Sequence, residues 1–315
     1  MNATDPLLVR RCGHVLVRLA LTGLLLLPLP VPAAEPDPAA AVFQSVIEQA
    51  REAAQSPLQP NPATLPPALR ALDYDQYRAI RFRSEAAIWR GQSPFELQLF
   101  HPGYLFTEPV TLHLVEDGVV RRLPFDPSVF RYDPPATGVG DALSGNPGWA
   151  GFRVHYPLHT PAYADEFLVF LGASFFRMVG RDQGYGLSAR ALAIDTAEPQ
   201  GEEFPAFRAF WIVRPEADRH TLTILALLDS RSLTGAYRFD VEPGMQTVVD
   251  VESVLFARRD VTKLGVAPLT SMYAHGDTSG RWYDDHRPRV HDSEGLLVQH
   301  SHGEWVWRPL TMAVL

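Results

Sequence analysis

Cysteine is almost absent from the chain, because Cys12 is the only one among 315 residues. It lies in an apolar N-terminal stretch that we interpret as a secretion signal, so the mature protein is expected to have none. Disulfide bonds, thiolate metal ligands and a cysteine nucleophile are therefore excluded from the mature protein. A chain of this length can bury enough apolar surface to fold without disulfide cross-links.

A transmembrane helix is not expected either, since it needs about 20 consecutive apolar residues. The apolar stretch LALTGLLLLPLPVP is shorter and is interrupted by three prolines. Arginines precede it and the small residues of PAAEP follow it, which is typical of a secretory signal peptide over residues 1–34. We expect cleavage to release an exported protein. An uncleaved anchor is the alternative, and the adjacent Arg10 and Arg11 leave open the choice between Sec and twin-arginine export.

Positive charge is also scarce, because the whole chain has a formal net charge of -8. The predicted signal peptide holds three arginines and one aspartate, so its removal makes the mature protein still more acidic. An acidic surface repels the phosphates of nucleic acids and of anionic lipids. We therefore expect no nucleic-acid partner.

Two motifs of nucleophilic and cofactor chemistry are missing or out of context. The sequence has no G-x-S-x-G elbow that would hold a nucleophilic serine. GYGLSA, at Gly184–Ala189, matches the dinucleotide pattern G-x-G-x-x-A, but a strand pattern follows it where a helix is required. We interpret it as a glycine turn between strands and expect no cofactor.

A metal site has only a weak signal. His300 and His302 would place both imidazoles on one face of a strand, as in many β-barrel metal sites. Glu304 follows too soon for a cupin-type ligand set, and nothing in the spacing of His286 and His291 requires them to join. A metal-dependent enzyme is therefore the third hypothesis, and our expectation is that no metal is bound.

Short runs with period-two alternation fill the chain from residue 95 onward, as in PVTLHLVED, AGFRVHYPL and AYRFDVEPG. In the first of these, Val110, Leu112 and Leu114 share one face and alternate with polar side chains. Evenly spaced strands indicate a β-sandwich or barrel. The amphipathic run FQSVIEQAREAAQ predicts one helix ahead of them, and SPLQPNPATLPPALR predicts an extended strap. We expect one all-β domain over residues 35–315 with an N-terminal helix.

Carboxylates next to aromatic residues are the remaining candidates for chemistry. Sugars stack their C–H faces on aromatic rings and exchange hydrogen bonds with charged side chains. The stretch VHDSEGLLVQHSHGEWVWRPL fits such a wall, and Glu202 and Glu203 precede a second aromatic run. Trp305 and Trp307 share one strand face and are equally compatible with a sugar groove and with the core. Glycoside hydrolysis needs two carboxyl groups, and the sequence does not choose the pair.

Longer segments then carry a resemblance to a known family. FLGASFFRMVGRDQGYGLSARALAIDTAEPQGEEFPAFRAFWIVRP, LTILALLDSRSLTGAYRFDVEPG, KLGVAPLTSMY, RPRVHDSEGL and GEWVWRPL resemble the periplasmic glucan biosynthesis protein G and its paralogue, protein D. The resemblance runs from FQSVIEQARE to Leu310. It implies a periplasmic protein that acts in the production of osmoregulated glucans with a β-1,2-linked glucose backbone. It also implies a galactose-mutarotase-like β-sandwich bearing a cleft, joined to a C-terminal immunoglobulin-like domain.

The same resemblance implies an activity and a set of residues. Members similar to protein D hydrolyse β-1,2-glucan with inversion, and the aspartate of their His-Asp-Ser motif, here Asp292, is the general base acting through water. The alternative is a non-catalytic protein that binds glucan and guides nascent chains. The expected partners are β-1,2-glucan and the membrane glucan synthase of the same pathway. The candidate substrate-binding residues are Arg190, His291, Glu304, Trp305, Trp307 and Arg308.

Near its C-terminus, the sequence departs from the pattern of the family that it resembles. The family continues after RPL with Asn-Asn-Pro, whereas residues 311–315 here read TMAVL. The catalytic acid of the family lies farther downstream, in a segment that this sequence does not contain. We therefore expect an incomplete sandwich without the immunoglobulin-like domain, and poor solubility caused by exposed strand edges.

Overall fold

The structure is a computed structural model that describes residues 37–59, 61, 65–141, 143, 145–216, 219–278 and 284–311. The predicted signal peptide lies outside these residues. Within the described part of the chain, no helix is both long enough and apolar enough to cross a membrane.

The predicted N-terminal helix is present as α1 (Pro38–Ala53). It begins earlier than the apolar pattern indicates, because the Asp37 side chain caps it by accepting a hydrogen bond from the Ala39 amide at 2.9 Å. Its apolar stripe, which includes Phe43, Val46 and Ala50, is buried. The stripe packs on the outer face of one sheet, next to Trp211.

That sheet has six strands in the order β14-β13-β12-β11-β3-β4. Its pairs are antiparallel, except that β11 runs parallel to β3. We call it the helix-covered sheet. Its strands are β3 (Thr111–Glu116), β4 (Val119–Leu123), β11 (Ala206–Val213), β12 (Leu222–Asp229), β13 (Leu233–Glu242) and β14 (Val248–Ala257).

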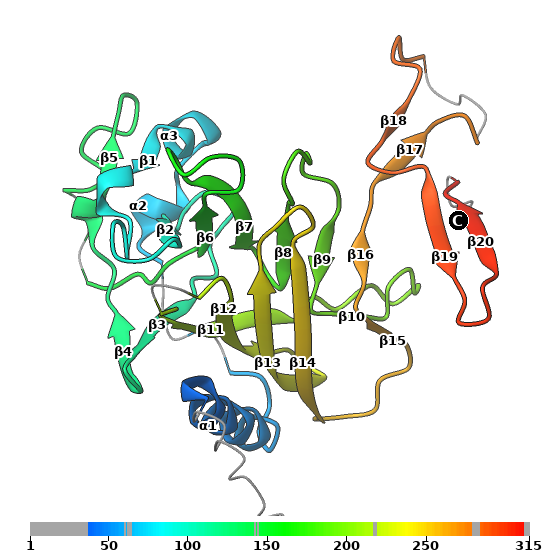
Figure 1. The fold of residues 1–315 in the computed structure, drawn as a ribbon, viewed down its shortest axis with the longest axis horizontal. Coiled ribbons are helices and arrows are strands. Elements are labelled where there is room, and N and C mark those ends of the chain that lie inside the picture. The colour runs from blue at the N-terminus through cyan, green and yellow to red at the C-terminus, as the bar shows by residue number, and fades with distance from the viewer. Residues whose placement is uncertain are drawn as a thin grey trace, which may run out of the picture. The chain divides into compact units, whose positions relative to one another are not determined.

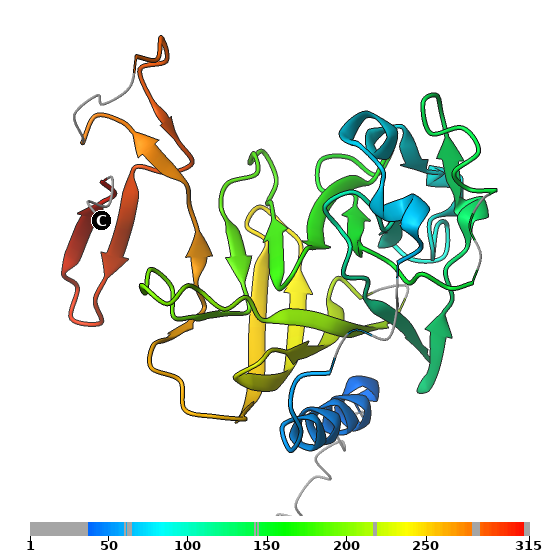
Figure 2. The ribbon, with the colours of Figure 1, turned by 180° about the vertical axis from the view of Figure 1, so that it is seen from behind.

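A second six-stranded sheet has the order β16-β9-β8-β7-β6-β2, and all its pairs are antiparallel. We call it the cleft sheet, because the cavities described below lie on it. Figures 1 and 2 show its strands from opposite sides. They are β2 (Glu96–Phe100), β6 (Gly151–Tyr156), β7 (Asp165–Leu171), β8 (Phe175–Met178), β9 (Ser188–Arg190) and β16 (Leu269–Thr270).

One apolar core lies between the two sheets and is rich in phenylalanine. Phe152 of the cleft sheet meets Phe210 of the helix-covered sheet with ring centroids 5.1 Å apart, and Phe170 meets Phe239 at 5.2 Å. Aromatic pairs at such distances prefer edge-to-face contacts, as both of these pairs show. The all-β sandwich with an N-terminal helix is thereby confirmed.

The alternation read from the sequence is confirmed at the level of single residues. Val110, Leu112 and Leu114 are buried in this core, whereas His113 points to the opposite face and stacks on Trp211 with centroids 4.9 Å apart. The glycine segment lies between two strands as predicted, because residues 179–187 connect β8 to β9, but residues 184–187 form an irregular loop and not a tight turn.

Several short elements were not predicted. The strap does not stay extended to its end, because Pro67–Arg70 forms helix α2 and buries Leu69. Helix α3 (Tyr74–Arg78) follows, with a capping box at Asp73. Four two-stranded pairs complete the described strands: β1 (Ile80–Phe82) with β5 (Phe130–Tyr132), β10 (Leu192–Ile194) with β15 (Leu264–Val266), β17 (Tyr273–His275) with β18 (Val290–His291), and β19 (Gly295–Gln299) with β20 (Trp305–Pro309).

Candidate functional site

The face of the cleft sheet that points away from the core carries arginines beside aromatic rings. Period two sends one set of side chains into the core and leaves the alternate set on this outer face. Three guanidinium groups lie over rings there: Arg153 over Phe100 at 5.5 Å, Arg177 over Tyr185 at 4.6 Å, and Arg190 over Phe175 at 5.3 Å and Phe204 at 4.8 Å. Charged groups and apolar rings therefore alternate across the sheet.

Arg190, at the end of β9, is the most buried of these cations, with 9% of its side chain exposed. Its Nη1 donates a hydrogen bond to Glu202 Oε1 at 2.6 Å, and Thr196 Oγ1 donates to the same oxygen at 3.0 Å. All three residues line a cavity of about 430 Å³ between β9, β10, β15 and β16. This volume lies within the roughly 300–1,000 Å³ of typical small-molecule sites.

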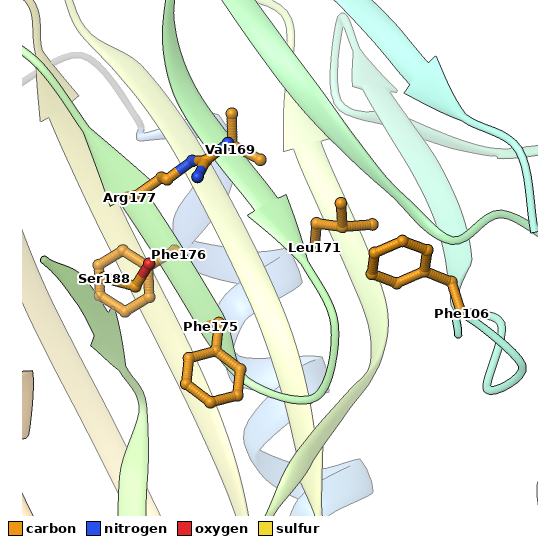
Figure 3. A pocket seen from close by; sticks show the side chains of 7 residues that line it. All are labelled: Phe106, Val169, Leu171, Phe175, Phe176, Arg177 and Ser188. Carbon is orange, nitrogen blue, oxygen red and sulfur yellow. The ribbon is translucent and has the colours of Figure 1, made fainter. Parts of the chain in front are cut away.

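A second hollow of about 310 Å³ lies on the same face, over β7, β8 and β9. Figure 3 shows side chains from these neighbouring strands around it, together with Phe106 from the loop ahead of β3. Phe106, Leu171 and Phe175 give it apolar walls, while Arg177 and Ser188 supply polar groups. Phe175 also lies under the Arg190 guanidinium, so this ring connects the hollow to the Arg190 cavity.

A polar network extends along β6 and β7. Arg153 Nη1 donates to Glu166 Oε2 at 2.8 Å, and the Tyr185 hydroxyl donates to Glu166 Oε1 at 3.1 Å. Burial, together with the negative charge of Glu166, raises the pKa of Tyr185 above its usual range. The phenol therefore stays protonated and remains a donor.

Asp292 follows β18 and lies beside the Arg190 cavity. Its amide donates to the Met272 carbonyl at 2.8 Å, and its Oδ2 accepts from the Met272 amide at 3.0 Å. The adjacent Ser293 hydroxyl is 2.9 Å from that of Ser271, which lines the cavity. The Asp292 side chain is exposed, so water can reach it.

His291 is held in place by the strand that pairs with β18. Its ring stacks on Tyr273 with centroids 5.3 Å apart, and its Nδ1 is 3.2 Å from the His275 carbonyl oxygen. Gly276 leaves room for the ring, because a Cβ there would lie 2.9 Å from the imidazole. His291 thus supports the segment that carries Asp292.

The four candidates at the last hairpin belong to a different sheet from Arg190, with three of them on its second strand. Glu304 directly precedes β20, which carries Trp305, Trp307 and Arg308 and, within the described part of the chain, pairs with β19 alone. The two indoles are 59% and 49% exposed, so neither belongs to the core. Among the described strands, this hairpin makes no pairing with the cleft sheet that carries Arg190.

The prediction that His300 and His302 share one face of a strand is wrong. Residues 300–303 form the turn between β19 and β20, and the two imidazole rings stack nearly parallel with centroids 5.3 Å apart. His302 Nε2 is 3.0 Å from a Glu304 carboxylate oxygen. The described residues contain no group of three histidine, aspartate, glutamate or cysteine side chains arranged to hold a metal ion.

Sequence reasoning overlooked most of the outer face. Arg153, Glu166, Arg177 and Tyr185 were not singled out, although the first three stand at polar positions of the strands AGFRVHYPL, DEFLVFL and FFRM. The sequence did contain a signal for these residues, because consecutive predicted strands each have a charged residue at a position that faces away from the core. Glu202 was noted beside an aromatic run, but not its pairing with Arg190.

Comparisons with known proteins identify the family of this chain. The family model described as "Periplasmic glucan biosynthesis protein, MdoG" matches residues 42–313. Glucans biosynthesis protein G of Ralstonia nicotianae is 52% identical over 270 residues, which cover 85% of this chain and 53% of that protein. The protein of the same name from Rhodopseudomonas palustris BisA53 is 45% identical over 299 residues, covering 94% of this chain and 59% of its own. The chain thus spans about half the length of the curated relatives that it matches.

Proposed function

Because the chain belongs to the MdoG family of periplasmic glucan biosynthesis proteins, we propose that it binds β-1,2-linked glucan on the outer face of the cleft sheet. We further propose that the complete protein hydrolyses this glucan with inversion, with Asp292 as the general base. The observation that carries the proposal is the cavity lined by the Arg190 and Glu202 pair, which is linked to the Asp292 segment by the contact between Ser271 and Ser293.

The chemistry of the cavity supports a neutral sugar ligand. Each hydroxyl group of glucose both donates and accepts hydrogen bonds, which the Arg190 and Glu202 pair can match. The guanidinium is already neutralised by the carboxylate at 2.6 Å, so an uncharged ligand costs no charge imbalance. In the neighbouring hollow, Phe175 and Phe106 offer apolar surface on which the C–H face of a second pyranose ring can rest.

The position of Asp292 supports a base that acts on water. Its Oδ2 is engaged by the Met272 amide, which leaves Oδ1 to accept a hydrogen bond from a water molecule. Inverting hydrolysis places its two carboxyl groups roughly 6.5–9.5 Å apart so that such a water fits between base and sugar. The chain spans about half the length of its curated relatives, so turnover is a property proposed for the full-length protein.

A test replaces Asp292 with asparagine in the native full-length protein. The Asn Oδ1 can still accept from the Met272 amide, so the segment keeps its structure while the base is lost. We expect release of new reducing ends from linear β-1,2-glucan to fall to background, with binding measured by calorimetry unchanged. Asp284→Asn, which removes an exposed carboxylate from the same segment, is the matched control and keeps full turnover. Turnover retained by Asp292→Asn rejects this residue as the base.

A non-catalytic glucan-binding role is the second candidate. Glu166 and Glu202, the carboxylates of the outer face, each accept a hydrogen bond from an arginine. The arginine stabilises the charged form of the carboxylate, which suits it to accept hydrogen bonds from sugar hydroxyls and not to donate a proton. The same assay separates the two functions. Calorimetric binding of glucan by the wild-type protein without any new reducing ends supports the binding role and removes the hydrolytic one.

We also propose that residues 1–34 are a cleaved signal peptide and that the glucan-binding domain begins at residue 35. The periplasmic family name supports export. N-terminal sequencing of the protein from a periplasmic extract checks the cleavage site, and a start at residue 1 contradicts it. The membrane glucan synthase of the pathway is the proposed protein partner, to be checked by cross-linking in intact cells.

A further inference from the structure

One edge of the Arg190 guanidinium has no hydrogen-bond partner among the described residues. Nη1 donates to Glu202, but Nε and Nη2 are buried and unpartnered. These two nitrogens lie on the same edge of the planar group, so their N–H bonds point in parallel. A buried donor without an acceptor is costly, and a native structure that contains one needs an explanation. The edge has the form of a site for two neighbouring acceptor oxygens.

The ring of Phe204 contacts this guanidinium and is nevertheless exposed to solvent. Its ring centroid is 4.8 Å from the Arg190 Cζ, yet the side chain is 55% exposed to solvent. The preceding residue, Glu203, is fixed, because its carboxylate accepts hydrogen bonds from the Ser232 amide at 2.8 Å and the Ser232 hydroxyl at 2.7 Å. The main chain is thus anchored, while more than half of the Phe204 side chain faces solvent.

We propose that Phe204 is a rotating cover, and that turning its ring away lets Arg190 Nε and Nη2 donate to two adjacent hydroxyl oxygens of one glucose unit. The inference rests on the proposed function, because it concerns the same cavity and the same glucan. A diol is favoured over an anion, since Glu202 already neutralises the cation and its carboxylate can accept from a third hydroxyl. Rotation of an exposed side chain takes picoseconds to nanoseconds and needs no loop movement.

The cover can be tested without any ligand by chemical labelling. An arginine-selective dicarbonyl reagent, followed by peptide mass spectrometry, reports how accessible each guanidinium is. We expect Arg190 to be modified several-fold faster in Phe204→Ala than in the wild type. Arg122, which is exposed on β4 of the helix-covered sheet, is the internal control and keeps its rate. Equal Arg190 rates in the two proteins overturn the cover.

The diol contact is tested by calorimetry with a linear β-1,2-gluco-oligosaccharide. Phe204→Ala is expected to bind about two- to fivefold more tightly, because the cation–π contact no longer has to be broken. Arg190→Lys lacks the planar fork and is expected to bind at least about tenfold more weakly. Unchanged affinity in Arg190→Lys, or weaker binding in Phe204→Ala, overturns the assignment.

The binding and labelling results together distinguish failure of the proposed glucan binding from failure of the inference about Phe204 and Arg190. If the wild-type protein does not bind the oligosaccharide at all, the glucan assignment and the diol contact both fall, while the labelling rates still decide whether Phe204 covers Arg190. If the oligosaccharide binds, it should slow Arg190 labelling in Phe204→Ala and leave Arg122, on the other sheet, unaffected. Absence of this protection places the ligand elsewhere and overturns the inference while the glucan-binding function stands.

Discussion

Glu202→Gln tests whether the Arg190 cavity holds a true buried ion pair. The two side chains are 9% and 20% exposed and meet at 2.6 Å, and glutamine keeps the shape of glutamate while removing its charge. Loss of one partner leaves the other charge buried without compensation, which costs about 3 kcal/mol at the lower end of measured cases. The lower end applies because the amide oxygen remains an acceptor. For a domain of this size that corresponds to a melting temperature lower by about 6–12 °C.

The double variant Glu202→Gln with Arg190→Met provides the control. Removing both charges removes the uncompensated cation, so its free energy of unfolding should return to within about 1 kcal/mol of the wild type. Urea denaturation of the four proteins of this cycle measures the coupling directly. If Glu202→Gln is as stable as the wild type, the Arg190 charge is solvated and the reasoning on the cavity is refuted. The same follows if the double variant is the least stable of the four.

Three further predictions concern stability and binding. Burial lowers the pKa of His101 to about 4, although the hydrogen bond between its ring and the Pro102 carbonyl acts in the opposite direction. As the pH falls, the histidine of the unfolded chain therefore takes up a proton before that of the folded protein. Stability should therefore decrease by about 3 kcal/mol between about pH 6.5 and pH 4 relative to a His101→Gln variant, and an equal pH dependence of both proteins in urea titrations contradicts this. Gly151→Ala should destabilise severely, because its Cβ would lie 2.2 Å from the Phe170 carbonyl oxygen, and a melting temperature like that of the wild type would be incompatible with this packing. Replacing Trp305 and Trp307 by alanine should weaken glucan binding without lowering the melting temperature, since both indoles are exposed; unchanged affinity removes them from the groove.

Alternation of apolar and polar residues was sufficient to predict the main strands and their core faces. It failed for β4, whose first four residues, VVRR, are all exposed. This edge strand is held by pairing with β3 on one side, and no buried side chain marks it in the sequence. The helical turn α2 was missed because it lies in a proline-rich segment, which suggested an extended chain.

The candidate site could be predicted only in part, because its residues meet through strand order. Arg153 on β6 and Arg177 on β8 look in the sequence like polar residues of a wet sheet face. They form one surface only once β6, β7, β8 and β9 lie side by side. Trp305 and Trp307 show the opposite limit. Period two placed them on one face, but whether that face is buried depends on which strands join the sheet. Among the described strands, only β19 pairs with β20.

The parallel pairing of β3 with β11 has a consequence for folding kinetics. Strands β11 to β14 form a meander whose turns are short, so these pairs close small loops and can form early. Adding β3 joins residues about 100 positions apart and closes a far longer loop at a higher entropic cost. We therefore expect the segment 206–257 to acquire hydrogen-exchange protection first during refolding, with docking of β3 as the slower step that closes the sandwich.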